Sequence, residues 1–162
     1  MNILNIFTEQ IENWVTGKTW KNIPKNKLVQ RENKFVYSIY KSNPNQWTTN
    51  FGENILALNV LTILFGNVNR PEIKNNMKPD FETDKSVYEI KTRSWSISGT
   101  VGEKILGTPY KYATVPKIYN KPLKIILIGY QEYEAISKFE LFNPGHIRSE
   151  FINLYKKYGI TY

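Results

Sequence analysis

Three side chains have types and a spacing that suit chemistry on phosphate: Asp80, Glu89 and Lys91. They lie in the stretch KPDFETDKSVYEIKTR, residues 78–93, which contains both aspartates of the chain. Neighbouring carboxylates raise each other's pKa unless a cation lies between them. The stretch therefore predicts a divalent-cation site, and ligands that are all oxygens favour Mg²⁺, with Mn²⁺ as a substitute.

The same stretch is expected to form an antiparallel hairpin with its turn at residues 84–85. With a loop of two or of four residues, this turn places Asp80 opposite Glu89. Lys91 shares their face, because side chains alternate along a strand. There the lysine could hold a phosphate oxygen, or orient and deprotonate an attacking water. The other face carries the residues available for the core: Phe81, Tyr88 and Ile90.

A second interpretation of this face needs no chemistry. Asp80, Glu89, Lys91 and Arg93 could form a cross-strand ladder of ion pairs on a solvated surface. The spacing Glu-x-Lys also occurs at residues 32–34 and 72–74, so the pattern alone is weak. Only the third occurrence lies in a predicted strand, with Pro79-Asp80 on the partner strand.

The helix before the hairpin is predicted from Phe51 to Phe65. Asn50 can cap it, Glu53 stands in the capping-box position, and Gly66 ends it. After the hairpin, Thr100 to Glu103 is a second capping-box pattern. It opens a helical region to about Tyr119 that is kinked or divided by Gly107, Pro109 and Pro116.

Further elements follow from the hydrophobic pattern. Leu123 to Ile128 is apolar on both faces and predicts a central strand. A helix from His146 to Tyr158 is expected to close the chain. Near the start, Asn2 to Trp14 predicts an amphipathic helix, and Lys34 to Tyr40 predicts a strand. The order predicts an α/β fold, a mixed sheet flanked by helices.

Length and composition limit the function classes. The 162 residues fit a single domain, and no linker or repeat divides them. Without cysteine there is no disulfide, thiol catalysis or cysteine zinc site. No apolar run reaches the ~20 residues of a membrane span, and no signal peptide opens the chain, so a cytoplasmic protein is expected.

The net charge of +8 predicts attraction to polyanions, with nucleic acid as the obvious partner. The alternative is that the many lysines are generic solubilising surface, since the chain is also rich in Asn and Ile.

The Pro79-Asp80 pair followed by Glu89-Ile90-Lys91 on a hairpin resembles the PD-(D/E)XK nuclease superfamily, on its type II restriction endonuclease side. The resemblance covers a core of about residues 51–129. It leaves residues 1–50 unmatched, as an arm available for dimerisation or recognition.

The resemblance implies roles for individual residues. Asp80, Glu89 and the carbonyl of Ile90 would bind Mg²⁺, and Lys91 would support the attacking water. Glu53 is similar to a glutamate on the helix before the hairpin in many members. Its alternative role is a simple capping residue, and both roles are compatible only if the side chain turns inward.

DNA contacts are expected from the helix after the hairpin. Ser98 and Thr100 lie at its start, where backbone N–H groups favour a phosphate. Lys104, Lys111 and Lys117 follow, although lysines at such positions are more often ordinary surface residues.

These observations together predict a Mg²⁺-dependent DNA endonuclease acting on double-stranded DNA. The alternatives are a structure-specific or repair nuclease such as a junction resolvase, a catalytically silent nucleic-acid-binding module, and a basic structural protein. Because one chain offers one set of site residues, a double-strand break predicts a homodimer, or a heterodimer in which this chain is the small subunit.

Overall fold

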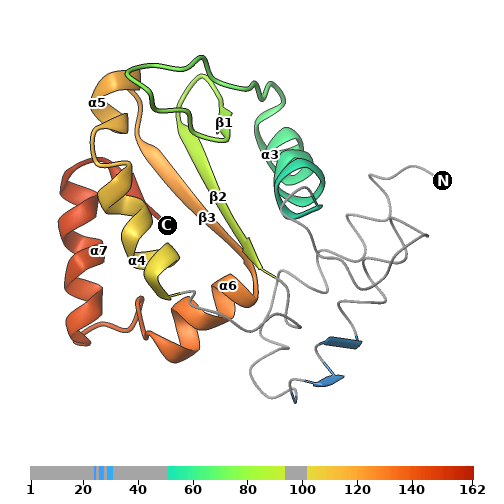
Figure 1. Cartoon of the computed structure of the whole chain (residues 1–162), viewed down its shortest axis with the longest axis vertical. Coiled ribbons are helices and arrows are strands. Elements are labelled where there is room, and N and C mark those ends of the chain that lie inside the picture. Colours follow the sequence, from blue (N-terminus) through green and yellow to red (C-terminus); the bar gives the residue numbers. More distant parts are fainter. Residues whose placement is uncertain (1–23, 25, 28, 31–50, 94–101) are drawn as a thin grey trace. The chain divides into compact units, whose positions relative to one another are not determined.

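The structure is a computed structural model that describes residues 24, 26–27, 29–30, 51–93 and 102–162 (Figure 1). The predicted N-terminal helix and strand, together with Ser98 and Thr100, lie outside these residues. The sheet and the helices described below belong to one compact unit, Thr49–Arg93 with Ser98–Tyr162.

Four strands form one mixed sheet in the order β1 (Phe81–Glu82), β2 (Val87–Arg93), β3 (Leu123–Gly129) and β4 (Ile160–Thr161). β1 and β2 are antiparallel, whereas β2–β3 and β3–β4 are parallel. The predicted α/β class is therefore confirmed. β3 lies between two strands, as its apolar sequence predicted.

The helix predicted before the hairpin is present in two parts. Its first part is the π-helix η1 (Phe51–Ala57), and α3 (Leu58–Phe65) continues it. Gly66 ends α3 with φ 75°, and its N–H donates to the Thr62 carbonyl. Glycine suits this position because a left-handed φ costs it little.

The helical region after the hairpin consists of α4 (Gly102–Lys111) and α5 (Val115–Tyr119), divided just before Pro116 as predicted, whereas Gly107 does not divide it. Pro116 lies in the first turn of α5, where a missing N–H costs no hydrogen bond. Pro109 lies inside α4. The predicted C-terminal helix is α7 (Ile147–Lys157), capped by His146, whose Nδ1 accepts from the Arg148 N–H at 3.2 Å.

Two features were not predicted. A helical stretch follows β3 directly, formed by α6 (Tyr130–Tyr133) and the π-helix η2 (Glu134–Lys138). β4 extends the sheet after Gly159, whose φ is 77°. A strand of two residues is too short to show a periodic pattern, so β4 could not be predicted from the sequence.

The two faces of the sheet have separate cores. Phe81, Tyr88 and Ile90 pack with Ala57 and Leu61 of the η1–α3 helix, as the predicted alternation required. The opposite core contains Val87, Leu123, Ile125 and Ile160 packed with Tyr112, Val115 and Tyr119. Glu89 and Lys91 stand two and four residues after Val87, so they share its face of the sheet, which α4 and α5 cover.

No helix in the part of the chain that the structure describes is long and apolar enough to cross a bilayer.

Candidate active site

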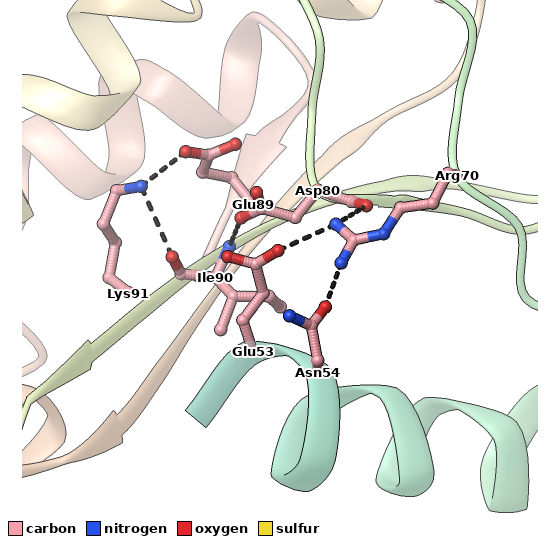
Figure 2. A network of polar contacts seen from close by, with 7 residues as sticks. All are labelled: Glu53, Asn54, Arg70, Asp80, Glu89, Ile90 and Lys91. Atoms are coloured by element: carbon pink, nitrogen blue, oxygen red, sulfur yellow. Dashed lines mark hydrogen bonds and ion pairs between the residues drawn. The ribbon is translucent and has the colours of Figure 1, made fainter. Parts of the chain in front are cut away.

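The hairpin register brings the predicted carboxylates together. Phe81 pairs with Tyr88, and the Asp80 N–H donates to the Tyr88 carbonyl at 2.9 Å. Asp80 therefore lies opposite Glu89, as the turn position predicted. The Asp80 side chain is fixed to the partner strand, because its Oδ2 accepts from the Ile90 N–H at 2.6 Å (Figure 2).

Glu89 is a buried carboxylate that touches one cation. Its side chain is 5% exposed, and its Oε1 is paired with the Lys91 ammonium. Lys91 Nζ also donates to the Ile90 carbonyl at 3.3 Å (Figure 2). Lysine thus lies between two of the groups expected to bind a metal.

The second oxygen of this carboxylate, Glu89 Oε2, is buried and accepts no hydrogen bond. A buried polar atom without a partner is costly, so a water, an ion or a neighbouring donor is expected at this oxygen. Tyr112 of the α4–α5 connection lies beside this carboxylate. Burial is the largest cause that raises the pKa of the Tyr112 phenol, and the charge of Glu89 and a side-chain hydrogen bond with Glu89 add to the increase.

The pKa of the Asp80 carboxyl is raised, as expected where acidic groups are buried close together. Burial, and next the charge of Glu89, raise the pKa of Asp80 from 3.8 to about 6. The hydrogen bond from Ile90 and the charge of Lys91 act in the opposite direction. A divalent cation would reverse this balance, because it favours both carboxylates in their charged form.

The structure does not contain the solvated ladder of ion pairs that was the alternative interpretation of this face. Glu89 and Arg93 are 4% and 8% exposed. Arg93 pairs with the buried Glu134 of η2 at 3.0 Å, on a different element from the hairpin. These two charged residues of the face are therefore buried rather than solvated.

Glu53 turns toward the hairpin, as its predicted role required (Figure 2). Its Oε1 accepts from Arg70 Nη1 at 2.8 Å, and the same nitrogen donates to the Asp80 carbonyl at 2.8 Å. Arg70 also contacts Asn54 Oδ1 and lies over the Phe81 ring, 4.2 Å from its centroid. Arg70 thus links the helix to β1, and sequence reasoning missed it because the connection that holds it has no periodic pattern.

Gly52 brings this helix against the sheet. A Cβ at residue 52 would lie 2.1 Å from Thr92 Oγ1 and 2.5 Å from its Cβ. No other residue fits this approach without movement of the helix or of β2. The close contact fixes the height of Glu53 above the strand.

The donor set fits a hard divalent cation at two carboxylates and one carbonyl. The groups are the carboxylates of Asp80 and Glu89 and the carbonyl of Ile90, and the Oε2 atom of Glu89 is buried. Glu53 is paired with Arg70 instead. Within the described residues no three His, Cys, Asp or Glu side chains form a ready metal cluster.

The predicted DNA-contact lysines lie on two elements. Lys104 and Lys111 are exposed on α4, and their spacing of seven places them on one face of that helix. Lys111 Nζ lies 4.9 Å from the centroid of the Tyr112 ring, so this cation is next to the site. Lys117 lies on α5 and lines an open hollow with Asn75, Thr114 and Ile118.

Comparison with known protein families, with curated proteins and with solved structures finds no match for this chain.

Proposed function

We propose that the protein is a Mg²⁺-dependent endonuclease that hydrolyses phosphodiester bonds of double-stranded DNA. The observation that carries the proposal is the placement of Asp80 opposite the buried Glu89, with the Ile90 carbonyl and the Lys91 ammonium beside them. The arrangement brings two acids, a carbonyl and a cation together, as the resemblance to PD-(D/E)XK nucleases implies.

Each side chain has a role in this proposal. Asp80, Glu89 and the Ile90 carbonyl would hold the divalent cation, which when bound supplies positive charge for hydrolysis at phosphate. Lys91 would orient the attacking water and stabilise negative charge that develops on the phosphate. Glu53, held by Arg70 at 2.8 Å, adds negative charge near Asp80.

The test is cleavage of supercoiled plasmid by purified protein. We expect cleavage with Mg²⁺ or Mn²⁺, little or none with Ca²⁺, and none in excess EDTA, because all proposed ligands are oxygens. The Asp80→Asn protein, purified identically, controls for contaminating nucleases. EDTA-resistant cleavage, or equal cleavage by Asp80→Asn, would exclude the proposal.

The DNA product of the plasmid assay distinguishes a homodimer from a heterodimer and from other classes of nuclease. A homodimer with two sites would give linear DNA without accumulated nicks, whereas a single site acting alone would nick. A heterodimer would need its larger partner for linear product. A junction resolvase would prefer branched over linear DNA, and binding without any cleavage would indicate a silent binding module.

A further inference from the structure

The outer face of α7, together with Tyr158 at its C-cap, carries an unusual row of apolar side chains. Ile147, Phe151, Leu154 and Tyr158 are 74%, 48%, 44% and 64% exposed. At 3.6 residues per turn their spacing of four, three and four places them within about 60° around the helix. We call this row the α7 stripe. Figure 1 shows α7 at the outside of the helices that flank the sheet.

The inner face of α7 is already occupied. Ile152 packs with the core around Ile105, Ala135 and Leu141, and Tyr155 packs with the core around Tyr119. The α7 stripe is therefore a second apolar face on a helix whose first face satisfies the fold. Exposed apolar residues scattered singly need no explanation, but a continuous row indicates an interaction surface.

The spacing of the stripe is that of a coiled-coil seam, in which apolar residues alternate at intervals of three and four. In an antiparallel pair of α7 helices, Phe151 would face Leu154 of the partner subunit, and Ile147 would face Tyr158 of the partner subunit. All four positions are matched in this one register. The stripe is therefore complementary to itself.

The charges beside the stripe agree with the same register. Glu150 and Lys157 are exposed, and neither forms an ion pair with another described residue of the chain. In the antiparallel register Glu150 flanks the seam opposite Lys157 of the partner subunit, and two-fold symmetry repeats this pair. A parallel pair would place Glu150 opposite the uncharged Tyr155 of the partner subunit, which favours the antiparallel arrangement.

We propose that α7 is the interface at which two copies of this chain associate, as an antiparallel helix pair. The occupant of the stripe is a second copy because the apolar and charged positions are both matched under one two-fold axis. The inference does not depend on nuclease activity. The interface is small, and interfaces below about 1,200 Å² are typical of transient complexes, so we expect a monomer–dimer equilibrium.

The first test is sedimentation equilibrium of the full metal-free chain over a wide concentration range. We expect the mass to rise from 19.0 kDa toward twice that value. Ile147→Glu should weaken the dimer by about tenfold or more, because each dimer loses two apolar contacts and buries two carboxylates. Its matched control is Ile73→Glu, since Ile73 is 66% exposed and lies off the stripe.

The second test exchanges the charges. Glu150→Lys and Lys157→Glu should each weaken the dimer several-fold, and the double variant should restore it. The helix dipole makes the opposite prediction for helix stability, because the exchange places a cation in the first turn and an anion in the last. Restored dimer in the double variant therefore reports pairing between subunits.

Three results would overturn the inference. One is a chain that stays monomeric at every concentration. Another is a dimer that Ile147→Glu leaves unchanged or that Ile73→Glu weakens equally. The third is a double charge variant that dimerises less well than either single variant. Circular dichroism of each variant checks that the total helix content is unchanged.

Discussion

Lys91 Nζ lies against both Glu89 Oε1 and the Ile90 carbonyl oxygen, two of the groups proposed to hold the metal (Figure 2). The lysine ammonium therefore supplies the positive charge that the buried Glu89 requires.

Removal of this ammonium should affect stability, metal response and catalysis together. In Lys91→Ala the buried Glu89 loses its cation, and we expect a loss on the order of 1–3 kcal/mol in the free energy of unfolding without metal. Mg²⁺ should then raise the unfolding temperature more than it does in the unsubstituted protein. DNA binding should remain while cleavage is lost. A fully active Lys91→Ala protein would contradict the assigned role.

Asp80 should make the metal-free protein less stable as the pH rises. Its pKa is raised from 3.8 to about 6, so the folded state holds this proton more tightly than the unfolded state. The resulting stabilisation is complete below about pH 4 and is lost as the pH passes through about 6. At neutral pH, Asp80→Asn should therefore be more stable than the unsubstituted protein by up to about 3 kcal/mol, with no difference near pH 4.

Denaturant unfolding of both proteins across this pH range measures the effect, and the Asp80→Asn protein should cleave no DNA. Asp84→Asn is the matched control, because Asp84 is exposed in the hairpin turn. A modest destabilisation by Asp80→Asn with activity retained would indicate a purely structural ion pair.

The contact between Gly52 and Thr92 should be intolerant of a single methyl group. Gly52→Ala places a Cβ 2.5 Å from Thr92 Cβ, and overpacking of this kind costs about 1–3 kcal/mol in the free energy of unfolding. Gly107→Ala in α4 is the matched control, since a Cβ there meets no atom within 4 Å. It should stabilise the protein by about 0.5–1 kcal/mol.

Thermal unfolding of the two variants checks this prediction. Thr92→Gly combined with Gly52→Ala should recover part of the loss, because it removes the atoms that clash. Equal stability of Gly52→Ala and Gly107→Ala would show that the helix can move away from β2 without cost.

The exposed lysines of α4 should set the salt dependence of DNA binding. Each phosphate contact contributes roughly one unit to the slope of log affinity against log salt. Lys104→Glu and Lys111→Glu should each reduce that slope, while Lys85→Glu in the hairpin turn should not. Fluorescence anisotropy with duplex DNA at several salt concentrations measures the slopes. Binding independent of salt would make the net charge of +8 a property of composition alone.

The sequence by itself determined the hairpin and its register. Strand alternation and a turn at residues 84–85 are local properties, and they placed Asp80 opposite Glu89 without knowledge of the rest of the fold. The sequence also predicted the end of α3, from the single glycine Gly66. It predicted the central position of β3 from its apolar run.

Only the tertiary structure decided what surrounds these carboxylates. Arg70 reaches Glu53 across 17 positions of sequence, and Tyr112 lies beside Glu89 from the opposite helical layer. The alternation of residues placed Glu89 on a face but gave no sign that α4 and α5 would cover it. Local sequence specifies backbone conformation, whereas burial and charge pairing depend on which distant elements pack together. That packing raised the pKa of Asp80 and buried Glu89 beside the Tyr112 phenol.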